Sequence, residues 1–272
     1  MSLVTITAGI GSEAYPVARE AAERLSIDLY DDERLREEFL AMGLSSGDLE
    51  SLNEKAPGFF RRLLDLRPNA YQELMESVVC HVARRGEGFI IGYGSAFLLQ
   101  DFGCALHVRI YSSESRRVER IMREWNVDES AAAKAIRRSD NERRGFMEYA
   151  FNIGWHDLSL FDLVVNVDKL GHESAASVIV DVASSEIINA CSLTALETMQ
   201  RFSLEKRVEA VVKKTILVPK NVQVSVTGEG EVTLMGIMNP LESKDKLIEA
   251  VKAVPGVHKV VSRIATEKIH DI

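Results

Sequence analysis

The chain has 272 residues, an ordinary apolar fraction and a net charge of −8, enough for one large or two modest globular domains. No apolar run approaches the roughly 18 residues that span a bilayer, and no signal peptide opens the chain, so we expect a cytoplasmic protein without a transmembrane segment. The three cysteines, Cys80, Cys104 and Cys191, are scattered and form no C-x-x-C pair, which argues against a zinc site and a disulfide framework. No basic patch indicates nucleic-acid binding.

The N-terminal stretch predicts a strand, a glycine turn and a helix. Residues 4–7 are β-branched and favour a short buried strand. Gly9 and Gly11 allow a tight turn, and Pro16 suits the first position of a helix. This unit opens nucleotide-binding α/β folds, in which phosphates lie on the N–H groups at the start of the helix.

The phosphate chemistry of this turn is incomplete. If Gly9 is the first glycine of a G-x-x-x-x-G-K-[ST] loop, Ala14 takes the second glycine position, Tyr15 the lysine and Pro16 the hydroxyl. Glu13 adds a negative charge that would repel a phosphate. Two interpretations stay open: a degraded phosphate-binding loop, or an ordinary strand-to-helix turn without a ligand.

Strands and helices alternate along the rest of the first two hundred residues. The apolar patterns predict further strands at 88–92, 106–111 and 161–167, and a brief strand or a turn at 27–30. They predict helices at 31–42, 69–85, 114–125 and 173–189, another helix after Asp128, and a helix-rich excursion at 45–57. This alternation is typical of an α/β fold, a parallel sheet with helices on both faces.

A second, small domain follows. The net charge is negative over residues 1–200 and positive over residues 201–272, and arginine gives way to lysine. Helices are expected at 204–215 and 243–254, and strands at 222–226, 232–236 and 257–265. We therefore predict a domain over 1–190, a linker over 191–202 and an α+β domain of αββαβ order over 203–272.

Several ordered motifs give the first domain a family resemblance. Residues 7–18 are similar to the loop S-R-x-[FY]-G-S-G-G-R-x-I-[AG] of the cytidylate-kinase-like family, bacterial P-loop proteins. Residues 88–94 resemble its V-I-V-G-R-G, and 117–120 its R-V-x-R. Residues 136–143 resemble its lid, and 155–157 and 161–166 its W-x-D and Y-D-L-V-I-N. The resemblance covers about residues 4–185. Residues 203–267 resemble a BON domain.

The resemblance implies a nucleoside monophosphate kinase that transfers the γ-phosphoryl group of ATP, with Mg²⁺, to CMP or dCMP. It implies three groups of site residues: catalytic lid arginines Arg137, Arg138 and Arg143; phosphate-loop residues Gly9, Gly11, Ser12, Glu13, Ala14 and Tyr15; and acceptor-side residues Gly92, Tyr93 and Gly94. A solvated, ion-paired helix face is the alternative interpretation of the lid arginines. No metal site is predicted, because Asp28, Asp31 and Asp32 are interpreted as a solvated acidic turn.

The departures from the family pattern fall on the groups that would neutralise phosphate charge. Ala8, Tyr15 and Tyr93 replace basic residues, and Glu13 and Ala14 replace glycines. Since phosphoryl transfer depends on positioning and charge neutralisation, the sequence favours a pseudokinase with weak or lost ATP and Mg²⁺ binding. An active CMP/dCMP kinase is the alternative. The BON resemblance implies attachment to a protein or an anionic lipid, or assembly into a homo-oligomer.

Overall fold

The computed structural model describes residues 2–42, 68–92, 94–100, 102–151, 153–154, 157–189, 193–216, 221–227, 230–238 and 243–266. The excursion expected at 45–57 lies outside these ranges. The chain divides into two compact units, Met1–Ala195 and Leu196–Ile272. Each unit has its own apolar core.

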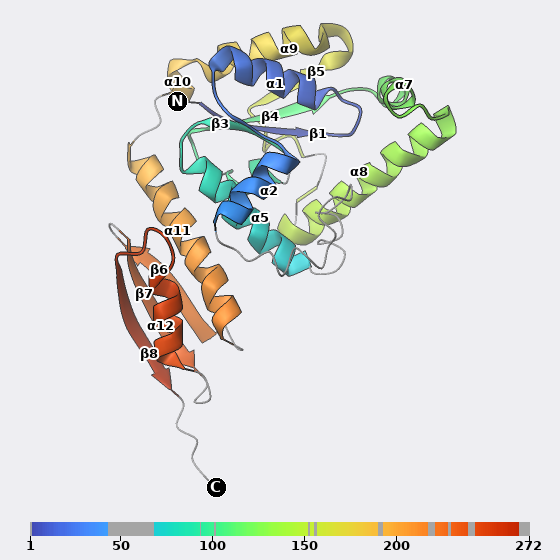
Figure 1. The fold of residues 1–272 in the computed structure, drawn as a ribbon. Helices are drawn as coiled ribbons and strands as arrows, with labels where there is room; N and C mark the ends of the chain where they lie inside the picture. The colour runs from blue at the N-terminus through green and yellow to red at the C-terminus, as the bar shows by residue number, and fades with distance from the viewer. Residues whose placement is uncertain are drawn as a thin grey trace. The chain divides into compact units, whose positions relative to one another are not determined.

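The first unit is built on a five-stranded parallel sheet (Figure 1), which confirms the predicted fold class. The strand order is β2-β3-β1-β4-β5, so the N-terminal strand lies in the centre. The strands are β1 (Leu3–Ala8), β2 (Leu29–Tyr30), β3 (Gly88–Ile91), β4 (Ala105–Tyr111) and β5 (Leu163–Asn166). Because all strands run the same way, their carboxyl ends meet at one edge, where ligands bind in open α/β sheets.

Helices cover both faces of this sheet (Figure 1). The helices described in this unit are α1 (Ala14–Leu25), α2 (Asp32–Ala41), α5 (Pro68–Ala83), α6 (Ser95–Leu98), α7 (Glu114–Trp125), α8 (Glu129–Phe151), α9 (Val167–Ala183) and α10 (Glu186–Asn189). On one face, small residues such as Ala18 of α1 and Ala176 of α9 are buried against Ile6 and Val108. Small side chains allow two helices to pack closely side by side on the strands that carry the site.

Several element boundaries differ from those predicted. Helix α1 begins at Ala14, so Pro16 is its third residue and not its first. The proline is tolerated there because none of the first four N–H groups of a helix has an intrahelical partner. Helix α9 begins at Val167, and α11 (Leu193–Thr215) at Leu193, so residues 193–202 of the expected linker are helical.

The second unit has the predicted αββαβ order. It comprises α11, β6 (Val222–Thr227), β7 (Glu231–Met238), α12 (Lys244–Lys252) and β8 (Lys259–Thr266). Strand β7 is central, antiparallel to β6 and parallel to β8. A Cβ at Gly236, whose φ is +144°, would lie 1.9 Å from the Asn221 carbonyl oxygen, so only glycine fits in this strand.

One expectation about cysteine is wrong. Cys104 is disulfide-bonded, whereas Cys80 is a buried free thiol. The odd number and scattered spacing of the cysteines gave no sign of this bond, because pairing depends on approach in space. Among the described residues, no helix is both long and apolar enough to cross a membrane.

Candidate functional site

The loop between β1 and α1 forms a tight turn. Gly11 has a φ of +73°, and a Cβ there would lie 2.9 Å from the Arg117 carbonyl oxygen, so the position needs glycine. The buried Ser12 hydroxyl donates a hydrogen bond to the Gly9 carbonyl at 2.6 Å. The hydroxyl therefore closes the turn and has a partner within the loop.

Glu13 precedes α1 in a left-handed conformation, with φ 60° and ψ 22°. This conformation costs a residue with a side chain about 1–2 kcal/mol relative to glycine. Its carboxylate accepts no capping hydrogen bond from the helix. It pairs instead with Arg120 of α7, with Oε2 and Nη2 3.2 Å apart. The Glu13 carboxylate therefore forms an ion pair with the Arg120 guanidinium beside the loop.

Arg120 joins the loop to the ends of β4 and β5. Its guanidinium donates hydrogen bonds to the Gly11 carbonyl at 3.1 Å and to the Ser112 hydroxyl at 2.7 Å. Asp168 lies 3.9 Å from it and accepts hydrogen bonds from Ser112 and Ser113. Burial raises the pKa of Asp168, but these hydrogen bonds and the Arg120 charge outweigh burial and hold it below its ordinary value.

Arg117, one turn earlier on α7, crosses the loop. Its Nε donates to the Ile10 carbonyl at 2.7 Å, and its two terminal nitrogens each donate to Asp140 of α8 at 2.8 Å. A Cβ on Gly9 would lie 2.6 Å from the guanidinium, so glycine at this position leaves room for Arg117. The carbonyls of Ile10 and Gly11 are therefore both bonded to arginines from α7.

The predicted lid arginines separate into two groups. Arg143 of α8 donates to the Ala8 carbonyl at the start of the loop. Arg137 and Arg138 are exposed and pair with Glu114 and Glu142, respectively. The solvated-face interpretation therefore fits these two, because α8 directs only one side of its surface towards the loop.

On the acceptor side, Gly92 and Gly94 both have positive φ, which the predicted glycine turn requires. The Gly92 N–H donates to the Ile6 carbonyl at 2.7 Å, which fixes the turn beside β1. A Cβ on Gly94 would lie 2.9 Å from the Phe151 ring, so the turn packs against the aromatic end of α8. Tyr93 lies outside the described residues.

Arg109 at the end of β4 was not among the predicted site residues. It is 8% exposed and lies over the Phe161 ring, with 5.5 Å between guanidinium carbon and ring centre. Burial lowers the pKa of Arg109, the Asp140 charge raises it, and the Arg143 and Arg117 charges lower it further. A charged residue within the apolar strand L-H-V-R-I was the available signal.

These groups border a cavity of about 400 Å³. Its lining comes from the loop, the end of β4, α7, α8, the connection after α8, and β5. The lining residues are Gly9, Ser12, Arg109, Ile110, Tyr111, Ser112, Arg117, Asp140, Leu158 and Val164. Loop and cavity together form the candidate site. Ala14 and Tyr15 begin α1, and Tyr15 is exposed.

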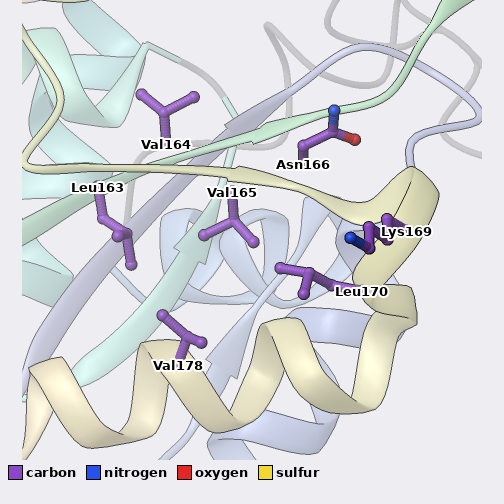
Figure 2. Close-up of a pocket in the computed structure, with 7 residues that line it drawn as sticks. All are labelled: Leu163, Val164, Val165, Asn166, Lys169, Leu170 and Val178. Atoms are coloured by element: carbon purple, nitrogen blue, oxygen red, sulfur yellow. The ribbon is translucent and has the colours of Figure 1, made fainter.

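A second cavity, of about 310 Å³, lies between β5 and α9. Figure 2 shows Leu163 and Val165 of β5 pointing towards Val178 of α9, while Val164 points to the opposite side of the strand. Lys169 is its only charged lining residue. With so few polar groups converging, this cavity has no recognisable chemistry.

Arg120→Met is expected to lower the free energy of unfolding by about 2–3 kcal/mol. Removing one partner of a fully buried ion pair costs about 3–5 kcal/mol, and the loss here is smaller because Glu13 and Asp168 are partly exposed. Arg116→Met is the matched control, since Arg116 pairs with Glu119 on the exposed side of the same helix, and about 0.5 kcal/mol or less is expected. Urea unfolding measures both. Equal losses of unfolding free energy in the two variants would contradict the prediction that Arg120 stabilises the fold by joining the loop to the ends of β4 and β5.

Two family models match this chain. Residues 3–169 match the cytidylate kinase-like family, and residues 202–268 match the BON domain. A cytidylate kinase of Staphylothermus marinus is 27% identical over 183 residues, covering 66% of this chain and 94% of that protein. A cytidylate kinase of Pyrobaculum islandicum is 25% identical over 182 residues, covering 66% and 92%.

An uncharacterized protein from Eubacterium ventriosum has a crystal structure with a TM-score of 0.53 to this chain. The identity is 19%, over 70% of this chain and 98% of that one. At this identity the likeness concerns the fold alone. It agrees with the parallel sheet and flanking helices of the first unit.

Proposed function

The chain belongs to the cytidylate kinase-like family, and from this premise we propose that its first unit is a nucleotide-binding module with little or no phosphoryl-transfer activity. The observation that carries the proposal is the position of Glu13. Its carboxylate stands in the phosphate loop and is paired with Arg120 at 3.2 Å. Glu13 and Arg120 neutralise each other, so Arg120 can neutralise an incoming phosphate only if its ion pair with Glu13 is broken, and the released Glu13 carboxylate would then repel that phosphate.

The remaining loop residues support the same conclusion. Phosphoryl transfer needs cations that offset the charge developing on the transferred group. Ala8 and Tyr15 supply none, and of the lid arginines in the described structure only Arg143 contacts the loop. We therefore expect ATP to bind weakly and its γ-phosphoryl group to stay in place.

The residues of the loop do not fit a magnesium ion. The position that provides a hydroxyl ligand in phosphate loops is Pro16, which has no hydroxyl. The Ser12 hydroxyl is bonded within the loop, and Asp168 is bonded to Ser112, Ser113 and Arg120. No group of three His, Cys, Asp or Glu side chains suited to a metal occurs in the described parts of the chain. The proposed module works without a metal-assisted step.

An active kinase that uses ATP and CMP or dCMP is the second candidate. The observation in its favour is that Arg109, Arg117 and Arg143 lie around the loop. Arginines from the strand and lid could replace the missing loop cation. Phosphorylation of CMP at an ordinary kinase rate by the natural chain would establish this candidate and overturn the proposal.

The second unit is a BON domain, for which we propose an attachment role. Its lysine-rich composition suits an acidic protein surface or anionic lipid, at about 1 kcal/mol for each well-placed lysine at a membrane. A nucleotide-responsive module joined to an attachment domain is the arrangement we propose for the whole chain.

Titration calorimetry with ATP–Mg, CMP and dCMP tests the proposed function. The natural chain is expected to bind ATP–Mg with a dissociation constant of about 1 mM or weaker, corresponding to roughly 4 kcal/mol of binding free energy or less. At least one monophosphate is expected to bind without turnover, as followed by product formation. No heat with any of the three nucleotides would contradict nucleotide binding, whereas rapid turnover would contradict the loss of transfer.

A further inference from the structure

Strand β5 forms one edge of the five-stranded sheet, and within the described residues no strand pairs with its outer side. An edge strand leaves N–H and C=O groups open to pairing with another strand, and proteins usually protect such edges. The opposite edge, β2, has only two residues and lies between Asp28 and Asp31. Strand β5 has four residues, LVVN, with neither a charged side chain nor a proline. It is therefore the less protected edge.

The surface beside β5 is apolar on both faces of the sheet. On one face, Leu163 and Val165 point towards Val178 of α9 and border the 310 Å³ cavity (Figure 2). Leu170 lines the same cavity, and Leu170 and Val178 are 45% and 38% exposed. On the other face, Val164 is 45% exposed. Apolar side chains that stay exposed along an unpaired strand favour burial against another strand.

The charges along this edge have opposite signs at its two ends. Lys169 lines the cavity at the carboxyl end of β5, close to Asn166 (Figure 2). Helix α9 then runs back along the strand to Val178. Asp181 is exposed and lies about one helical turn beyond Val178, towards the amino end of β5. In one copy, Lys169 and Asp181 are 12 residues apart, roughly 18 Å along a helix, which is too far for an ion pair.

A two-fold axis perpendicular to the sheet at β5 brings complementary groups together. With the axis at Val164, two antiparallel β5 strands place Val164 opposite its counterpart, and Leu163 opposite Val165 of the second copy. Opposite residues of an antiparallel pair share a face of the sheet, so the apolar side chains of the two copies meet. The same axis brings the carboxyl end of each β5 to the amino end of the other. Lys169 of each copy then faces Asp181 of the second copy.

We propose that two copies of this chain associate through β5 of their first units, forming one continuous sheet with reciprocal ion pairs between Lys169 and Asp181. Such an interface is isologous, as in the commonest class of homodimer. Val164 also lines the cavity beside the loop. The Val164 side chain of the second copy would therefore border that cavity and contribute to the candidate site. This association does not depend on whether the loop has lost phosphoryl transfer.

Sedimentation equilibrium of the full chain over a dilution series tests the proposal. The natural chain is expected to associate reversibly to twice its mass of 30.3 kDa. Lys169→Asp and Asp181→Lys are each expected to weaken association at least about tenfold, because each places like charges across the interface. The double variant is expected to recover the natural dissociation constant to within about threefold, because both ion pairs return with reversed signs. Lack of recovery would contradict the two-fold arrangement.

An apolar position in the interface has a matched control in the second unit. Val178→Arg is expected to abolish association, whereas Ile237→Arg in β7, a position 50% exposed, is expected to leave it unchanged. Thermal unfolding establishes that both variants fold. A chain that stays monomeric over the whole dilution series would overturn the proposal. A dimer that persists in Val178→Arg, or that only Ile237→Arg abolishes, would also overturn it, and the second result would place the interface on the second unit.

Discussion

The triple variant Glu13→Gly, Ala14→Gly, Tyr15→Arg is expected to bind ATP–Mg at least about tenfold more tightly than the natural chain, since removing a repelling charge near a phosphate is worth about 1–4 kcal/mol. Three physical changes contribute. Glycine relieves the left-handed backbone at position 13, Arg120 loses its carboxylate partner, and arginine at position 15 adds a cation at the start of α1. The strand, turn and helix that direct the loop are already present.

Titration calorimetry of the single substitutions separates these contributions. Glu13→Gly removes the repulsion and the strain, and is expected to give most of the gain. Tyr15→Arg alone is expected to give little, because Glu13 still opposes the phosphates. A triple variant that binds ATP–Mg no better than the natural chain would show that the weak affinity arises elsewhere than in the loop.

The second large effect concerns the two cores. Leu234→Ala in β7 is expected to lower the free energy of unfolding of the second unit by about 2–5 kcal/mol, since Leu234 is fully buried at the centre of its sheet. Phe89→Ala in β3 is the matched substitution in the first unit, where about 3–5 kcal/mol is expected.

If the units fold separately, each substitution changes one unfolding transition and leaves the other in place. Scanning calorimetry of the full chain with each variant measures this directly. A single transition that shifts in both variants would contradict separate folding. The expectation is based on two apolar cores, each formed within its own unit.

Local patterns predicted most of the fold. The alternation of strands and helices, with a glycine turn after residues 4–7, was sufficient for a parallel α/β sheet, because apolar periodicity reflects which side of each element is buried. The αββαβ order of the second unit was predicted for the same reason. Boundaries were less certain: the helix that begins at Leu193 runs through the expected linker, since chain composition does not mark where a continuous helix changes its packing partners.

For the candidate site, too, some features follow from the local sequence and others only from the tertiary structure. The sequence by itself determined the loop, the acidic residue at position 13, the missing loop cations and the proline that replaces a hydroxyl, because these are chemical identities at fixed spacing. Only the tertiary structure decided which distant side chains reach the loop. It brings Arg109, Arg117 and Arg120 to the site with Arg143, and leaves Arg137 and Arg138 in solvent. Which side of α8 faces the loop follows from helix packing across the sheet edge, and no local spacing in the sequence contains that information.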